Sequence, residues 1–342
     1  MKKLIWLMLL VITTVGMVSC SGFIEPTHQP LIRETVKVEK SETQVESKEL
    51  TKTPQVSASR LFNHIQRLNF TRYTPAERSR TRSYITSELK ELGWKPKLEK
   101  FTDGVNILAE RQGSDKEAGT ILVAAHYDTV YISPGADDNA SGVAVVLEIA
   151  RLLGSYPTPR TLQLAFFDRE EAGLIGSKAF VSKKAHLQNL RGVIVVDMIG
   201  FACHTVGCQK YPVGLPVTPP STQGDFLAII SDVEHSSLLS AFENSTSSSI
   251  ALNKRSKSGS LLPPILTLPI PFKGLLTPDV LRSDHAPFWY QGVGAVLVTD
   301  TANLRTPHYH QSSDTLGTID RKFFTGSAQI VVNATLKLLE NE

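Results

Sequence analysis

The sequence carries little net charge and few cysteines. Its 36 Lys and Arg residues and 33 Asp and Glu residues leave a formal charge of +3 over 342 residues, and the basic residues form no stripe interleaved with aromatic residues. We therefore expect no nucleic-acid partner. No internal repeat is visible. The hydrophobic content of 41% and charged content of 20% are typical of a globular domain with a full core, and the length fits one domain with an appendage.

The amino-terminal apolar run at residues 4–18 is too short to span a bilayer comfortably. It follows two lysines, a pattern that predicts a signal peptide over residues 1–19. The run ends in Met17-Val18-Ser19-Cys20, which resembles the lipobox of bacterial lipoproteins. We therefore expect export, lipid modification of Cys20 and anchoring to a membrane of the bacterial cell envelope, on the periplasmic side or the outer surface. An ordinary signal peptide with an incidental cysteine is the alternative.

The segment after the expected lipid attachment has few aromatic residues and no sustained apolar periodicity. Residues 20–54 are rich in Lys, Glu, Thr and Ser and contain one aromatic residue, so they cannot bury enough surface to order themselves. This composition predicts a disordered tether. The folded catalytic domain is expected at residues 55–342, beginning near Ser57.

Hydrophobic periodicity predicts the secondary structure of that domain. Leu61, Ile65 and Leu68 recur at helical spacing, and further helices are expected at residues 75–92 and 141–153. Short apolar runs suit buried strands; they lie at residues 121–125, 162–167, 193–196 and 295–298. The alternation of strands and helices predicts an α/β sandwich. Residues 203–277 are Pro- and Ser-rich around one strand-like run at 226–230. We interpret them as loop-rich insertions near a cleft; mobile surface is the alternative.

Three of the predicted strands are followed by residues that can bind metal. His126 follows the strand at 121–125, Glu170 and Glu171 follow the strand at 162–167, and Asp197 follows the strand at 193–196. The carboxyl ends of parallel strands meet at one edge of a sheet, so these side chains should converge. Each residue alone has an ordinary structural explanation. Their joint placement predicts a metal centre.

The types of candidate ligand indicate the kind of metal centre. His, Asp and Glu without cysteine suit catalytic rather than structural zinc, because a catalytic site keeps a position open for water. Asp138 lies just before the predicted helix at 141–153, where an ionised carboxylate is favoured. A carboxylate there could bridge two metal ions.

Six separated motifs carry a resemblance to a known family, and they cover the chain from about Ser57 to its end. They are Ala-His-Tyr-Asp at 125–128, Gly-Ala-Asp-Asp-Asn-Ala-Ser-Gly at 135–142, Glu-Glu-Ala-Gly-Leu-Ile-Gly-Ser at 170–177, Asp-Met-Ile-Gly at 197–200, Ser-Asp-His-Ala-Pro-Phe at 283–288 and Tyr-His-Gln-Ser-Ser-Asp-Thr at 309–315. In type and order they resemble the co-catalytic di-zinc aminopeptidases of metallopeptidase family 28. The resemblance implies a three-layer α/β/α sandwich around a mostly parallel, mixed central sheet in a single catalytic domain.

The resemblance also implies the metal ligands. Asp138 would bridge two zinc ions. His126 and Asp197 would complete one zinc site, and Glu171 and His310 would complete the other. Family members carry a cis peptide bond after the bridging aspartate, which corresponds to the bond between Asp138 and Asn139.

Further residues are assigned roles around the metals by the same resemblance. Glu170 would be the general base, and Asp128 would hold the imidazole of His126 in position. Tyr309 would hydrogen-bond the substrate carbonyl or simply pack. Asp284 and His285 would support the site without binding metal, and His204 and His308 are assigned either structural roles or roles in supporting the ligands.

Together these assignments imply a zinc-dependent exopeptidase that acts on peptides with a free amino terminus. Two zinc ions would activate water, and Glu170 would accept its proton. One alternative is a glutaminyl cyclase-like acyltransferase with one zinc, although the presence of both His126 and Asp197 favours two. A non-catalytic binding protein is another. Carboxypeptidase specificity would need a basic pocket, and the candidates Lys254, Arg255 and Arg282 cannot be placed from sequence.

The two remaining cysteines are expected to pair. An exported chain meets oxidising conditions, and Cys20 is occupied by lipid in the expected form, so Cys203 and Cys208 would form a disulfide that closes a small loop. Two free thiols are the alternative. The preferred amino-terminal residue and the oligomeric state cannot be predicted from the sequence.

Overall fold

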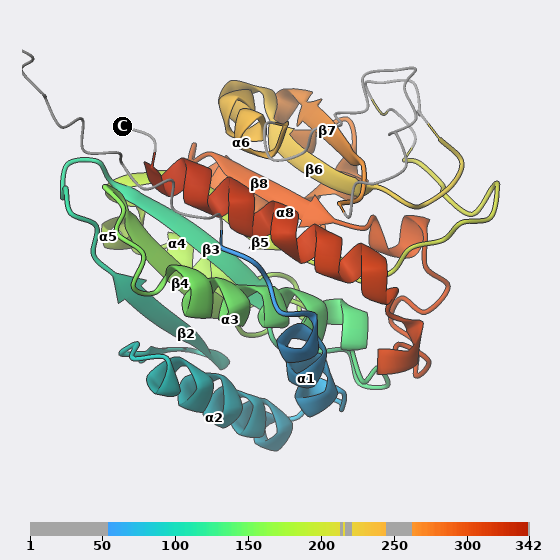
Figure 1. Ribbon diagram of the computed structural model, residues 1–342, viewed down its shortest axis with the longest axis horizontal. Helices are drawn as coiled ribbons and strands as arrows, with labels where there is room; N and C mark the ends of the chain where they lie inside the picture. The colour runs from blue at the N-terminus through green and yellow to red at the C-terminus, as the bar shows by residue number, and fades with distance from the viewer. Residues whose placement is uncertain (1–53, 213–214, 216–220, 244–261, 341–342) are drawn as a thin grey trace, which may run out of the picture. The chain divides into compact units, whose positions relative to one another are not determined.

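Eight strands form one mixed sheet in the order β1-β2-β4-β3-β5-β8-β6-β7 (Figure 1). Their bounds are β1 Lys97–Phe101, β2 Gly104–Arg111, β3 Thr120–His126, β4 Thr161–Phe167, β5 Leu190–Val196, β6 Leu227–Asp232, β7 Ile265–Ile270 and β8 Ala295–Thr299. The four central strands, β4, β3, β5 and β8, run parallel. β2 is antiparallel to β4, and β6 is antiparallel to β8. The predicted α/β class with a mixed central sheet is therefore confirmed.

The computed structural model describes residues 54–212, 215, 221–243 and 262–340, all within the unit Thr51–Glu342. The predicted signal peptide, the lipid attachment at Cys20 and nearly all of the predicted tether lie outside the described residues. Within the described ranges, no helix combines the length and apolarity that a membrane span requires.

Helices cover both faces of the sheet. Their bounds are α1 Ala58–Leu68, α2 Pro75–Glu91, α3 Gly142–Leu153, α4 Ile175–Val181, α5 Lys184–Leu187, α6 Ser240–Glu243, α7 Ala286–Tyr290 and α8 Arg321–Glu340. α3 and α8 lie side by side on one face (Figure 1). Alternate residues of β3 belong to different cores: Val123 shares a cluster with α3 and α8, whereas Leu122 shares one with Phe180 of α4 and Phe288 of α7. This alternation produces the three layers.

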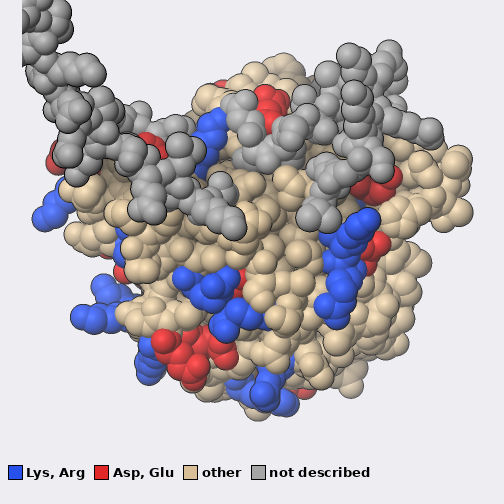
Figure 2. Space-filling model, viewed as in Figure 1, with Lys and Arg blue, Asp and Glu red and all other residues tan. Residues whose placement is uncertain are grey.

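The strongest local signals predicted element bounds well. The helix expected at 75–92 is α2, which begins with a capping box between Thr74 and Glu77 and has Pro75 in its first turn. The chain turns after it at Gly93, whose φ of 83° lies in the left-handed region that favours glycine. On the face in Figure 2, basic and acidic side chains are interspersed and form no continuous stripe of one sign.

The loop-rich segment contributes more to the sheet than the single strand expected there. β6 corresponds to the predicted run at 226–230, but β7 was not predicted and pairs in parallel with β6 at the end of the sheet. β7 contains Pro269, which cannot donate a backbone hydrogen bond and is tolerated because β7 is an edge strand. β1, β2 and α8 were also not predicted.

Candidate metal centre and its cleft

Three adjacent parallel strands bring the candidate ligands to one edge of the sheet. β4, β3 and β5 are neighbours. His126 is the last residue of β3, Asp197 directly follows β5, and Glu170 and Glu171 follow β4 after a short turn. The ligand atoms of His126, Glu170 and Asp197 all lie within 4.8 Å of one another. The structure therefore brings together the side chains that the strand-end pattern placed on one edge.

Asp138 lies between two histidines and presents a different oxygen to each. Its Oδ1 is 3.3 Å from Nε2 of His126, and its Oδ2 is 3.2 Å from Nε2 of His310. Nε2 of His126 is also 3.5 Å from Oδ1 of Asp197, and Nε2 of His310 is 2.9 Å from Oε2 of Glu171. The arrangement is two His-carboxylate pairs that share one central carboxylate.

The backbone around Asp138 is held by a carboxylate to which the sequence reasoning gave no role. Asp314 accepts the backbone N–H groups of Asp137 at 2.9 Å and of Asp138 at 3.0 Å. The peptide bond between Asp138 and Asn139 is cis, as the resemblance implied. Asp314 lies in the motif at 309–315, close in sequence to His310, and this proximity was the available signal.

Asp128 contacts both sides of the candidate centre. Its Oδ1 lies 3.6 Å from Nδ1 of His126, a distance that suits electrostatic attraction rather than an ordinary hydrogen bond. Its two oxygens accept the backbone N–H groups of Glu170 at 3.0 Å and of Glu171 at 3.3 Å. Asp128 thus fixes the backbone of the glutamate pair while facing the imidazole.

Burial and charge perturb the titration of these groups. Burial raises the pKa of Glu171 to about 7 and raises the pKa of Glu170 well above its usual value. Burial opposes ionisation of Asp138, but His126 and His310 outweigh it and hold the pKa of Asp138 below its usual value. For His126, burial alone would lower the pKa, yet the negative charges of Glu170 and Asp197 raise it well above the ordinary value.

The donor set fits divalent metal ions. Four carboxylates and two imidazoles gather here, three of them buried and three half-buried, and divalent cations would compensate the charge of the ionised carboxylates. Within the described part of the chain, Oε1 of Glu171 is buried without a hydrogen-bond partner, as is Nδ1 of His126. Imidazole and carboxylate ligands without thiolate suit zinc in a catalytic site.

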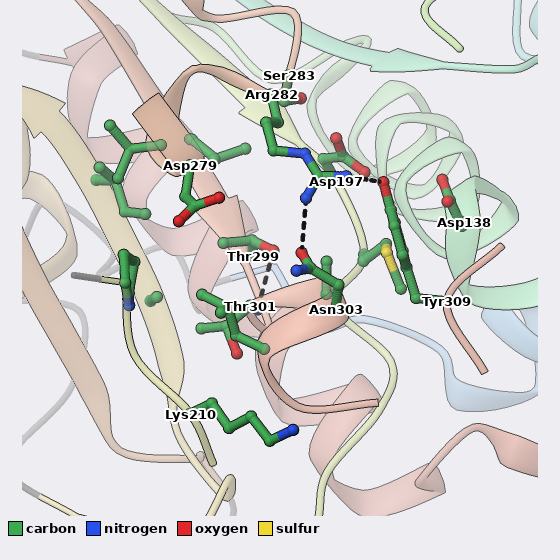
Figure 3. Close-up of a pocket in the computed structure, with 18 of the residues that line it drawn as sticks. Asp138, Asp197, Lys210, Asp279, Arg282, Ser283, Thr299, Thr301, Asn303 and Tyr309 are labelled. Atoms are coloured by element: carbon green, nitrogen blue, oxygen red, sulfur yellow. Dashed lines mark hydrogen bonds between the residues drawn. The ribbon is translucent and has the colours of Figure 1, made fainter. Parts of the chain in front are cut away.

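Tyr309 lies beside the centre, and its contacts are specific. Its ring stacks on the imidazole of His310 with centroids 3.7 Å apart. Nη2 of Arg282 donates a hydrogen bond of 2.9 Å to Oη of Tyr309, and Nη1 of Arg282 donates one of 3.2 Å to Oδ1 of Asn303 (Figure 3). Tyr309 therefore makes a specific hydrogen bond in addition to its packing contact.

The other residues expected near the site belong to neither ligand group; Asp284 and His285 are buried, and His308 is half-buried. Asp284 accepts a short hydrogen bond from Oγ of Ser177, and burial raises its pKa to about 7. His285 packs edge-on against Trp289, and burial lowers its pKa to about 3, so its ring is neutral. His308 contacts Oγ of Ser313 at 2.9 Å.

The sequence also predicted a disulfide between Cys203 and Cys208. The structure pairs Cys203 with Cys208, whose Cα atoms are 6.4 Å apart, in a disulfide. His204, within this loop, contacts Oδ2 of Asp320 at 3.2 Å. Lys254 and Arg255 lie outside the described residues, so only Arg282 of the three basic candidates is placed.

A cleft extends from the candidate metal ligands over the half of the sheet formed by β8, β6 and β7. The ligands line one end, together with Tyr309 and Arg282. Buried apolar side chains line the other end: Phe226, Ala228, Ile230, Leu268 and Leu297. Figure 3 shows Asp279, Thr299 and Asn303 around the space between the two ends. The sequence placed residues 203–277 near a cleft, but it did not predict the apolar wall, because β7 and the packing of β6 against β8 were not predicted.

Comparison with known proteins places the chain in a family. Residues 106–235 match the model of Peptidase family M28. The Escherichia coli protein YfbL, named as uncharacterized, is 30% identical over 248 residues, covering 69% of this chain and 70% of YfbL. The probable lipoprotein aminopeptidase LpqL of Mycobacterium tuberculosis is 31% identical over 231 residues, covering 63% of this chain but only 42% of LpqL.

Solved structures share the fold at low sequence identity. The LapA aminopeptidase of Legionella pneumophila matches with a TM-score of 0.65 and 17% identity, over 84% of this chain and 73% of LapA. The glutaminyl cyclase of Porphyromonas gingivalis matches with a TM-score of 0.56 and 19% identity, over 82% of this chain and 98% of the cyclase. The fold alone is thus shared by different activities. From the family model and the similarity to YfbL, we conclude that the chain belongs to peptidase family M28 and is a hydrolase acting on peptides.

Proposed function

We propose that the protein is a zinc-dependent aminopeptidase with two zinc ions per chain. The main support for this proposal is that Asp138 presents one carboxylate oxygen to His126 and the other to His310. His126 and Asp197 would hold one ion, Glu171 and His310 the other, and Asp138 both. Zinc at these positions would polarise the scissile carbonyl and make a water molecule more acidic. The name of LpqL as a probable aminopeptidase supports this activity.

Glu170 has the properties of a general base for this reaction. It is buried beside His126 and Asp197, and its backbone is fixed by Asp128. Burial raises the pKa of Glu170, which strengthens it as a base. Glu170 would accept the proton of the attacking water and pass it to the leaving amine.

Tyr309 would stabilise the oxygen of the scissile carbonyl as negative charge develops on it. A guanidinium can only donate hydrogen bonds, so Oη of Tyr309 must act as the acceptor from Arg282. The hydroxyl proton of Tyr309 therefore remains free to donate to the substrate. Arg282 is a positioning residue in this scheme.

The apolar end of the cleft, which we call the apolar cavity, would receive the side chain of the amino-terminal residue. Phe226, Ala228 and Leu268 line it and are buried, so an apolar side chain would be removed from water there. Carboxypeptidase specificity would need a cation for the terminal carboxylate; Arg282, which lines this cleft, donates to Tyr309 and Asn303, and Lys210 also lines the cleft.

We also propose a cellular location for the protein, based on the lipobox-like sequence at residues 17–20. Cys20 would carry lipid and anchor the exported enzyme to a membrane of the bacterial cell envelope, as the name lipoprotein aminopeptidase for LpqL suggests for that relative. Incorporation of labelled palmitate into the wild-type protein, but not into Cys20→Ala, tests the anchor.

Zinc titration combined with product analysis tests the activity. The purified protein is stripped of metal, titrated with zinc and assayed on a panel of aminoacyl p-nitroanilides with free or acetylated amino groups. We expect activity to rise to a maximum at two equivalents of zinc, with release of free amino acids only from substrates with a free amino group. One equivalent with cyclisation of an amino-terminal glutamine would support the glutaminyl cyclase alternative. No turnover of any substrate would support a non-catalytic protein.

A further inference from the structure

A second cavity adjoins the metal centre on the side away from the apolar cavity. It is lined by Tyr73, Asp128, Tyr131, Arg169 and Glu171. Glu171 lines both cavities, so the two meet at the candidate ligands. Asp128 and Tyr131 follow β3, and Arg169 and Glu171 follow β4, whereas β6, β7 and β8 line the apolar cavity. The sheet order therefore places the two cavities on opposite sides of the metal centre along one edge of the sheet.

Two tyrosines form an exposed aromatic wall in this second cavity, which we call the aromatic shelf. Tyr131 is 71% exposed and Tyr73 is 44% exposed. Their rings meet edge to face, with centroids 5.6 Å apart. Arg169 pairs with Asp103 at 2.5 Å, so its charge is already compensated. The shelf thus offers aromatic surface rather than a free cation.

A buried arginine holds the shelf in place. Arg72 precedes Tyr73 and is fully buried. Its guanidinium donates to the backbone carbonyls of Tyr127 at 2.8 Å, Pro134 at 2.7 Å and Gly135 at 2.9 Å. Arg72 thus fastens the segment that carries Tyr131 to the segment that carries Tyr73. Aromatic surface held in position loses little freedom when it binds a ligand.

We propose that the aromatic shelf binds the side chain of the second residue of the peptide and selects apolar or aromatic residues there. The inference rests on the proposed aminopeptidase function. If the amino-terminal side chain enters the apolar cavity, the chain beyond the scissile bond must leave on the other side of the metal ligands. That path crosses Tyr131 and Tyr73. The side chain of the second residue would cover aromatic surface that is otherwise exposed to water.

Three substrates without a free carboxylate test the subsite: leucinamide, leucyl-glycinamide and leucyl-phenylalaninamide. Leucinamide has no second residue, so its kcat/KM serves as the reference for the metal centre in every variant. We expect the zinc-loaded wild type to prefer the phenylalanine peptide over the glycine peptide by about tenfold in kcat/KM, the size expected for a good aromatic contact. Tyr131→Ala should reduce this preference to about twofold, and Tyr73→Ala should reduce it less.

The matched control is Tyr290→Ala. Tyr290 is 64% exposed at the end of α7 and lines neither cavity, so its removal should leave the preference at the wild-type value. An unchanged preference in both shelf variants, or an equal loss on all three substrates, would overturn the subsite while leaving the aminopeptidase assignment intact. If the wild type with zinc hydrolyses none of the three, the proposed function fails and the subsite fails with it.

Discussion

The two adjacent glutamates provide the sharpest test of the mechanism, because the structure gives them different surroundings. Glu171 lies 2.9 Å from Nε2 of His310 and belongs to the ligand group with Asp138. The ligand atoms of Glu170, His126 and Asp197 lie within 4.8 Å of one another, so proximity alone would also permit Glu170 to bind metal. Glu170→Gln and Glu171→Gln distinguish a base from a ligand.

The expected effects follow from the contacts. Asp128 holds both glutamates through their backbone N–H groups, so neither substitution removes that support. Glu170→Gln should retain both zinc ions and lose about 10²–10⁴-fold in kcat, equivalent to about 3–5 kcal/mol of transition-state stabilisation. Glu171→Gln removes a charged ligand and should weaken one zinc site by at least about tenfold.

The assay combines kcat at saturating zinc with metal content after gel filtration and with thermal unfolding to check folding. Glu117→Gln, an exposed glutamate on another part of the chain, is the matched control and should behave as wild type. If Glu170→Gln keeps near-normal turnover with two zinc ions bound, Glu170 is not the base. If it loses zinc while Glu171→Gln does not, the two roles are reversed. Small and similar losses in both would indicate only a local structural role.

Three further predictions follow from the structure. Chelation of zinc should lower the melting temperature by about 10 °C, because it leaves buried carboxylates without a counter-charge. Added zinc should restore the melting temperature, and an unchanged value after chelation would contradict a metal-dependent fold. Burial lowers the pKa of His64 from 6.5 to about 4, so the unfolded chain gains this proton before the folded chain does as pH falls through that range. The free energy of unfolding measured in urea should therefore fall by up to about 3 kcal/mol, and His64→Gln should abolish this loss. In the wild-type background, Arg282→Met should lower kcat about 10–100-fold with little change in KM, and it should lower kcat no further when Tyr309→Phe is already present. Additive losses of kcat would show that Arg282 does not act through Tyr309.

Local sequence was sufficient for the α/β class and for the strand ends that carry the candidate ligands. The run predicted at 121–125 is β3, Thr120–His126, and the run at 162–167 is β4, Thr161–Phe167. Central parallel strands are buried on both faces, so they appear as continuous apolar runs whose ends are easily recognised. His126 and Asp197 were then placed by the rule that parallel strands end at one edge. Asp138 was proposed from its position just before the helix at 141–153, whereas His310 was supplied only by the resemblance.

Only the tertiary structure showed how distant segments combine around these ligands. Arg282 and Tyr309 are far apart in sequence, as are Arg72 and Gly135, yet each pair is joined by a hydrogen bond. The edge strand β7 and the apolar cavity it helps to form were also invisible, because Pro269 obscures its strand pattern. Residue type and spacing reflect the burial of each segment, and they therefore determined the class and the ligand-bearing strand ends. Contacts between segments depend on how the layers pack, so the shelf, the cavity and the support of Tyr309 were decided by the fold.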